Sequence, residues 1–154
     1  MKKSAGILVY RHINKKIEFF LVHPGGPLWA KKDAGAWSIP KGEYEDGEDP
    51  LQAARREFEE ETGQTVSGKF IELTPFKLKS GKTIYAWAVE GNIDEGNIIS
   101  NTFEMEWPPR SGKRKAFPEV DRAGWFDADT AKEKLNERYG GMIEEVLGLI
   151  TTSS

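Results

Sequence analysis

The chain has 154 residues, of which 38% are hydrophobic and 31% charged, and its net charge is −3. This length predicts a single domain with a buried core, and the net charge does not favour nucleic acid or an anionic membrane as a partner. The sequence has no cysteine and only two histidines, which excludes disulfides, cysteine-based metal sites and a three-histidine site. Any metal ion would therefore bind mainly to carboxylates, which favours Mg²⁺ or Mn²⁺.

The first part of the chain predicts a hairpin, two loops and one well-marked helix. Apolar runs over 5–11 and 17–23 flank a polar turn and predict a β-hairpin. Residues 24–36 and 42–47 predict loops, with a short apolar piece at 36–39 between them. A helix is expected over 50–62, because Asp49 can cap it, Pro50 suits its first turn and Gly63 suits its end.

The second part predicts strands followed by helices. Residues 69–78 and 83–89 predict a second hairpin, 101–107 a strand, 108–117 a basic loop and 124–127 a short strand. Helices are expected over 129–136 and 141–150. This order favours an α/β fold with helices on the faces of a mixed sheet. The apolar run over 5–10 is too short for a membrane span or a signal-peptide core, and together with the missing cysteines it predicts a cytoplasmic protein.

Three glutamates border the buried face of the predicted helix. At about 100° per residue, Glu57, Glu60 and Glu61 fall in the arc next to the apolar face. Like charges at these spacings destabilise a helix by about 0.2–0.5 kcal/mol per pair. The three residues form either a solvated acidic face or a cation site. Because hard divalent cations prefer several anionic oxygens, we expect the cation site.

The charges are unevenly distributed along the chain. Residues 42–63 carry nine acidic and two basic side chains, a net charge of −7, and the remainder of the chain carries +4. An acidic metal site together with a basic segment suits a polyphosphate, because the metal and the cations can share the phosphate oxygens. The alternative for the basic segment is a solvated loop. The candidate substrate-binding residues are Lys41, Arg110, Lys113, Arg114 and Lys115.

The spacing of Gly42, Glu48, Arg56, Glu57, Glu60, Glu61 and Gly63 resembles the Nudix box, which would cover residues 42–64. Phe58 matches an apolar position of the pattern, and Gln64 departs from it because the last residue is usually aliphatic, so we expect Val66 to supply the missing packing contact. The resemblance implies one Nudix domain over residues 1–154, with the Nudix fold, an α/β/α sandwich around a mixed sheet.

The resemblance also implies a metal-binding role for part of the box. Glu57, Glu60 and Glu61 would bind the divalent ions, and a backbone carbonyl near Lys41 or Gly42 would add a ligand. In the family these ions activate a water molecule that attacks phosphorus, and they neutralise charge on the bridging oxygens. The implied cofactor is Mg²⁺, with Mn²⁺ as a substitute.

Further residues are implied to support this site. Arg56 would orient one of the metal-binding carboxylates, and Glu48 would brace the loop and help to hold metal-bound water. Family members often add a carboxylate six residues before a late tryptophan, and Glu119 stands at that position here as a metal ligand or base. Glu104 and Glu106 are the alternatives to Glu119 for this role. Glu119 could instead be an ordinary acidic residue of a loop without a functional role.

The resemblance implies an activity on nucleoside diphosphates linked to another group. The segment 37–43 is similar to the branch of dinucleoside polyphosphate and diphosphoinositol polyphosphate hydrolases. We therefore expect Mg²⁺-dependent cleavage of a phosphoanhydride bond in a nucleoside or dinucleoside polyphosphate. The alternatives are a nucleotide-sugar hydrolase, an RNA 5′-end pyrophosphohydrolase and, from another class, a non-catalytic nucleotide-binding sensor. The sequence leaves a homodimer open.

A nucleobase would need an exposed aromatic ring on which to stack. His23 ends a predicted strand and is expected to be structural. The sequence does not decide among the six aromatic candidates, which are Trp29, Tyr44, Phe76, Tyr85, Phe103 and Tyr139.

Overall fold

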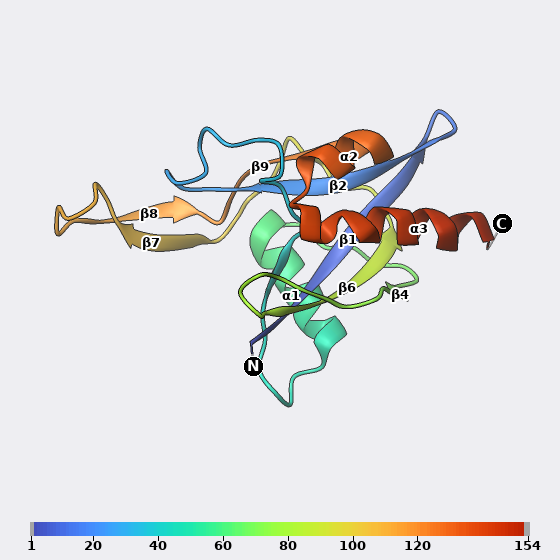
Figure 1. The fold of residues 1–154 in the computed structure, drawn as a ribbon, viewed down its shortest axis with the longest axis horizontal. Helices are drawn as coiled ribbons and strands as arrows, with labels where there is room; N and C mark the ends of the chain where they lie inside the picture. The colour runs from blue at the N-terminus through green and yellow to red at the C-terminus, as the bar shows by residue number, and fades with distance from the viewer. Residues whose placement is uncertain (1, 153–154) are drawn as a thin grey trace.

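The computed structural model describes residues 2–152, and a seven-stranded mixed sheet forms its centre (Figure 1). The long path through the sheet runs β4-β6-β1-β2-β9, while β3 pairs with β1 and β5 pairs with β6. The strands of this sheet are β1 (Lys3–Ile13), β2 (Lys16–Pro24), β3 (Lys41–Glu43), β4 (Ile71–Glu72), β5 (Phe76–Lys77), β6 (Thr83–Glu90) and β9 (Val120–Asp127).

The sheet begins with the predicted hairpin. Strands β1 and β2 are antiparallel, and the turn between them places Asn14 and Lys15 at positive φ, as a tight two-residue hairpin requires. Strand β6 then pairs in parallel with β1, from the pair of Lys3 with Thr83 to that of Tyr10 with Glu90. A parallel neighbour next to antiparallel ones confirms the predicted mixed sheet.

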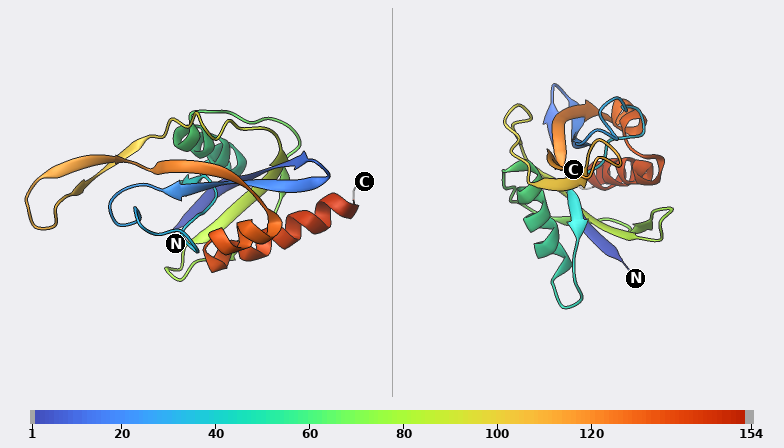
Figure 2. Two further views of the ribbon diagram at one scale, coloured as in Figure 1. Left: turned by 90° about the horizontal axis from the view of Figure 1, so that it is seen from above. Right: turned by 90° about the vertical axis from the view of Figure 1, so that its left-hand side faces the viewer.

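Helices cover both faces of the sheet (Figure 2). Because side chains alternate along a strand, Ile7 and Val9 of β1 belong to the core beneath helix α1 (Pro50–Thr62). Leu8 and Tyr10 belong to the core on the other face, with helices α2 (Ala128–Lys134) and α3 (Gly140–Thr152). The result is the predicted three-layer α/β/α sandwich. Among the helices of residues 2–152, none is long and apolar enough to cross a membrane.

Helix α1 has the predicted bounds and caps. The side chain of Asp49 accepts a hydrogen bond from the Gln52 N–H at 3.0 Å, and Pro50 stands in the first turn. Gly63 ends the helix at φ 74°, where its N–H donates to the carbonyl of Glu59. Ala53, Ala54 and other apolar side chains of α1 are buried against the sheet, so the glutamates are held at its border.

Some sequence predictions need correction. Residues 41–43 form a strand because they pair with β1, although a loop was predicted from residue 42. The predicted strand over 69–78 is split into β4 and β5, because the N–H of Thr74 donates to the carboxylate of Glu145 and Pro75 has no N–H. The strand predicted at 124–127 begins at Val120, and a 3₁₀ turn, η1 (Glu137–Tyr139), separates the closing helices.

The predicted basic loop is also partly wrong. Strand β7 (Thr102–Glu106) pairs with β8 (Arg114–Pro118) in a separate two-stranded sheet, so only the tip of the basic segment is loop. This β7–β8 hairpin extends from the body of the protein at the end of the sheet (Figure 1).

Candidate active site

The site begins where β3 passes closely over α1. A Cβ built on Gly42 would lie 2.1 Å from both Cδ and Oε2 of Glu57, far closer than such atoms approach. The carboxylate of Glu57 therefore occupies the space that a side chain at position 42 would fill. Only 13% of this side chain is exposed. A glycine at position 42 thus allows Glu57 to lie directly against the backbone of β3.

Two carboxyl groups of α1 resist ionisation here. Burial raises the pKa of Glu61 to about 8, although the charge and the N–H of Lys41 act in the opposite direction, and the charges of Glu57 and Glu119 raise it further. Burial also raises the pKa of Glu57, with a further contribution from Glu60. The N–H of Lys41 lies 3.4 Å from Oε1 of Glu61. A bound cation would offset the energetic cost of burying these carboxylates and would reduce their mutual repulsion.

Arg56 ties the neighbouring carboxylates together. Its Nε and Nη2 donate to the two oxygens of Glu48 at 3.1 and 3.3 Å. Its Nη1 donates to Oε1 of Glu57 at 2.9 Å and to Oε1 of Glu60 at 3.4 Å. A single guanidinium therefore restrains the rotamers of three glutamates at once.

Glu119 is brought to the box by a backbone bridge. The N–H of Asn101 donates to the carbonyl of Glu60 at 2.8 Å, and the carbonyl of Asn101 accepts from the N–H of Glu119 at 2.9 Å. The same segment satisfies a second helix-end carbonyl, because the N–H of Ile99 donates to Thr62. The end of α1 is thus joined to the residue that precedes β9.

The two alternative acids have other contacts. Oε1 and Oε2 of Glu106 accept from the N–H groups of Arg110 and Gly112, which stabilises the turn of the β7–β8 hairpin. Glu104 lies on β7, where its Oε1 is 3.6 Å from Nε of Arg114. Both side chains therefore interact within the hairpin.

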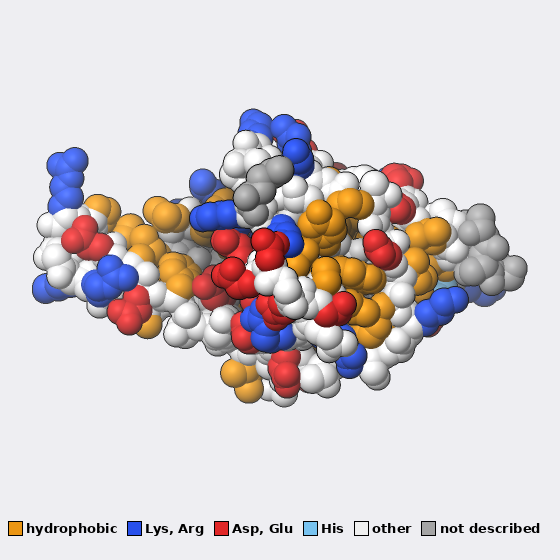
Figure 3. Space-filling view, turned by 90° about the horizontal axis from the view of Figure 1, so that it is seen from below, with side chains coloured by type: hydrophobic (Ala, Val, Ile, Leu, Met, Phe, Trp, Pro, Cys, Tyr) orange, Lys and Arg blue, Asp and Glu red, His pale blue; other side chains and the backbone are white. Residues whose placement is uncertain are grey.

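The structure separates the basic candidates. Lys41 lies in β3 beside the carboxylate of Glu61, whereas Arg110 and Lys113 lie at the tip of the hairpin and Arg114 and Lys115 on β8. Figure 3 shows acidic side chains gathered near the middle of one face, with basic ones at the projecting end and hydrophobic ones between them. The four hairpin cations are not brought next to the box helix.

The donor set fits a hard divalent cation. Within residues 2–152, no three His, Asp or Glu side chains already converge as a metal site, and Arg56 contacts the oxygens of Glu57 and Glu60. The chemistry is nevertheless suitable. The Glu57 carboxylate lies against the backbone of β3 at Gly42, and burial raises the pKa of both Glu57 and Glu61, so a cation would favour their ionised forms.

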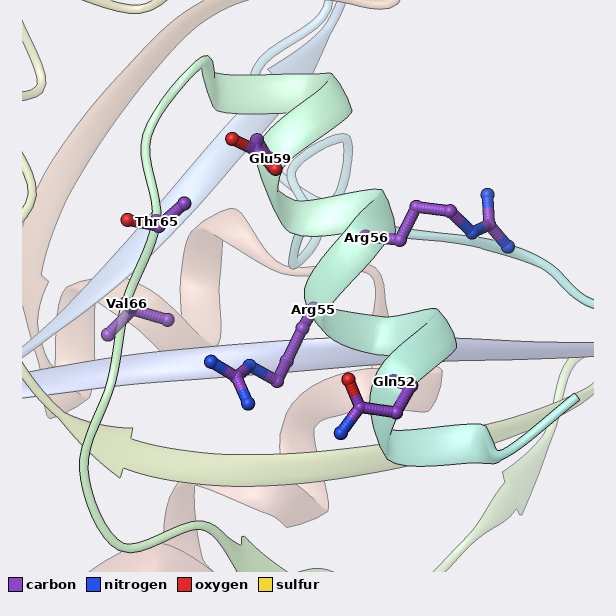
Figure 4. Close-up of a pocket in the computed structure, with 6 residues that line it drawn as sticks. All are labelled: Gln52, Arg55, Arg56, Glu59, Thr65 and Val66. Carbon is purple, nitrogen blue, oxygen red and sulfur yellow. The ribbon is translucent and has the colours of Figure 1, made fainter.

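A pocket of about 300 Å³ lies on the opposite flank of α1 (Figure 4). Arg55 points across it towards the segment with Thr65 and Val66, while the guanidinium of Arg56 points the other way. The guanidinium of Arg55 lies 5.3 Å from the ring centroid of Phe70. Arg56 therefore borders both this pocket and the glutamate site, whereas Arg55 faces the pocket.

Gln64 has a role that the sequence did not predict. Its side-chain Nε2 donates to the carbonyls of Asp94 and Asn97, and its Oε1 accepts from the N–H of Asp94. Val66 is buried in the core beneath α1, which confirms the expected substitute packing. A polar residue at a position that is usually aliphatic was the signal for such a hydrogen-bonded contact. The hydrogen bonds of the Gln64 side chain anchor the segment that leads to Asn101.

The comparisons with known proteins decide the family. The model described as NUDIX domain matches residues 2–146. The chain belongs to the NUDIX domain family. The RNA pyrophosphohydrolase of Bartonella henselae is 35% identical over 142 residues, which is 84% of this chain and 78% of that protein. The asymmetrical bis(5′-nucleosyl)-tetraphosphatase of Caenorhabditis elegans is 41% identical over 63 residues, which is 41% of each protein.

The structural likeness extends over the whole NUDIX domain. A crystal structure of a C. elegans Ap4A hydrolase binary complex has a TM-score of 0.65 and 21% identity, and the match covers 99% of both chains. At this identity the likeness shows the fold alone. The NUDIX chain spans only 23% to 41% of the length of three curated relatives that it matches.

Proposed function

We propose that this NUDIX protein is a divalent-metal-dependent pyrophosphohydrolase. Its substrate would be a nucleoside diphosphate linked to another group, with nucleoside and dinucleoside polyphosphates favoured. The observation that carries the proposal is the carboxylate cluster of α1, in which Glu57 fills the space above Gly42 and the pKa of Glu61 is raised to about 8. The names of the C. elegans and B. henselae relatives support a phosphoanhydride substrate.

Each residue of the cluster has a distinct proposed role. Glu57, Glu60, Glu61 and Glu119 would hold Mg²⁺ or Mn²⁺ together with a backbone carbonyl at Lys41 or Gly42. When bound, the metal would supply charge neutralisation on the phosphate oxygens and activation of a water molecule. Because its side chain contacts two of these ligands, Arg56 keeps the carboxylates oriented, and Glu48 fixes the guanidinium from the other side.

Proton release accompanies metal binding in this proposal. Because burial raises the pKa of Glu61 to about 8, the protonated form of this carboxyl group is favoured at neutral pH in the metal-free protein. A divalent cation binds the carboxylate and not the acid, so binding at neutral pH releases a proton. The side chain of Lys41 lies near the same carboxylate and is placed to meet a phosphate oxygen.

A second candidate is removal of pyrophosphate from an RNA 5′ end. The relative from B. henselae, which matches most of the chain, carries that name. The cations of the β7–β8 hairpin lie away from the glutamates, where they would contact the following phosphates of a longer chain. A nucleotide sugar has no such phosphates.

The test is a substrate panel with Mg²⁺ that contains ATP, a dinucleoside tetraphosphate, a nucleotide sugar and a 5′-triphosphorylated RNA. We expect turnover of polyphosphates in the wild type and a loss of several orders of magnitude in Glu60→Gln. Glu95→Gln, an acid in the β6–β7 connection, is the matched control and should retain full activity. No turnover of any substrate would refute the enzyme proposal and favour the nucleotide-binding sensor.

A further inference from the structure

The 17 Phe, Tyr and Trp side chains all lie within the described residues, and only one of them is exposed. This residue is Trp29, with 39% of its surface accessible. Tyr44 and Tyr139 are buried, and the remaining candidate rings are half-buried. Stacking of a nucleobase requires a ring whose face is accessible to the ligand, and an exposed ring meets this requirement. The structure therefore narrows the six aromatic candidates to Trp29.

The loop that carries Trp29 begins at the glutamate site. The N–H of Gly25 donates to the carbonyl of Glu119 at 2.9 Å. A Cβ at Gly26 would lie 2.9 Å from Cζ of Phe103, so this glycine packs directly on that ring. The N–H of Trp29 then donates back to the carbonyl of Gly26 at 3.3 Å, which closes a turn. Gly25 is thus bonded to Glu119, and the turn that starts at the next residue, Gly26, carries Trp29.

The loop is fixed to the core and not free. Nε2 of buried His23 lies 2.7 Å from the carbonyl of Lys32, and its Nδ1 lies 2.8 Å from Oδ1 of Asp121. The indole N–H of Trp37 donates to Asp33 at 2.7 Å. The predicted structural role of His23 is consistent with these contacts. A ring on an anchored loop can bind a partner at little cost in conformational entropy.

A cation accompanies the exposed ring. Nζ of Lys32 lies 5.0 Å from the ring centroid of Trp29, and the N–H of Lys32 donates to the carbonyl of Trp29. The loop therefore presents a flat apolar surface and a positive charge side by side. A ligand that combines an aromatic ring with negative charge satisfies both, and a nucleotide has this chemistry.

We propose that Trp29 is the stacking platform for the nucleobase of the substrate and makes the enzyme select nucleotides over base-free polyphosphates. This inference rests on the proposed function, because it assigns the base end of a substrate whose phosphates meet the glutamates. The turn at Gly26 sets the distance between Trp29 and Glu119. The base binds on the loop while the phosphates lie over the box.

The test compares Trp29→Ala and Trp29→Phe with the wild type, and Leu28→Ala is the matched control. Leu28 is 61% exposed on the same loop but has no aromatic ring. The probes are ADP, which has a base, and inorganic tripolyphosphate, which has none, both with Mg²⁺. Binding is measured by calorimetry and by quenching of tryptophan fluorescence.

We expect Trp29→Ala to raise the Kd for ADP by about five-fold or more, since stacking on a protein aromatic is worth that much per base. Tripolyphosphate should bind equally to all variants. Trp29→Phe should keep most of the affinity for ADP but lose most of the quenching, because the quenched fluorophore is gone. Leu28→Ala should bind ADP like the wild type.

Other outcomes overturn the inference. An unchanged Kd for ADP in Trp29→Ala shows that the base binds elsewhere. An equal loss for tripolyphosphate, or an equal loss in Leu28→Ala, shows a general effect of the loop. The two proposals fail separately: absence of turnover on the substrate panel refutes the hydrolase, whereas turnover with a KM that does not respond to Trp29→Ala refutes only the stacking role.

Discussion

The substitution Gly42→Ala tests the centre of the proposed site with a single methyl group. The added Cβ would lie 2.1 Å from Cδ and Oε2 of Glu57 and 2.6 Å from Oε1. Real Cβ atoms essentially never come closer than 3.0 Å, so the carboxylate must move by about 0.9 Å or more. The obstacle is the end of a flexible side chain, so the backbone can remain in place.

The expected effects on activity and stability therefore differ. A misplacement of about 1 Å in a catalytic group costs about a hundred-fold in rate, so we expect kcat to fall by about that factor. Gly42 is not at positive φ, and replacement of such a glycine by alanine leaves the free energy of unfolding level or raises it by about 0.4–1 kcal/mol. The assays are steady-state kinetics with Mg²⁺ and urea denaturation of the same samples.

Two controls make the result specific. Gly141→Ala adds a methyl group in α3, where nothing lies within 4 Å of the new atom, and should leave the rate unchanged. In a Glu57→Ala background, Gly42→Ala should cost almost nothing further, because the carboxylate that it displaces is absent. Full activity of Gly42→Ala, or additive losses in the double variant, would refute the role of Gly42 in positioning Glu57.

Three more predictions follow from the site. EDTA should abolish turnover and Mg²⁺ or Mn²⁺ should restore it, and full activity in excess chelator would contradict the metal assignment. In EDTA, folding stability should fall as the pH rises from about 4.5 to about 8, because the raised pKa of Glu61 makes the folded state bind the proton more tightly than the unfolded state does. Glu61→Gln should flatten this dependence in urea titrations across that range, and an unchanged slope would show that another group titrates. Neutralising Lys113 and Lys115 together should raise KM several-fold for the triphosphorylated RNA but not for a nucleotide sugar. The effect is limited to several-fold because partly exposed charges contribute about 0–1 kcal/mol each. An equal change for both substrates would show that the hairpin does not recognise the length of the phosphate chain.

The sequence by itself determined the features that depend on local signals. The helix over 50–62 was predictable because Asp49 caps it and Gly63 ends it, and both signals act within a few residues. The first hairpin followed from two apolar runs around a polar turn. The order of apolar, acidic and exposed positions on the helix placed Glu57, Glu60 and Glu61 at its border, because the helical repeat fixes which residues share a face.

The tertiary structure decided everything that depends on contacts between distant segments. Only the fold shows that Asn101 joins Glu60 to Glu119, because no local pattern encodes a bond between a helix end and a strand start. The strand at 41–43 exists because β1 supplies its partner, and the basic segment forms a hairpin because β7 lies opposite it. Solvent exposure also depends on how the whole core packs. The sequence around Trp29 therefore does not distinguish it from the buried aromatic residues, and only the packing of the sheet and helices shows that it is exposed.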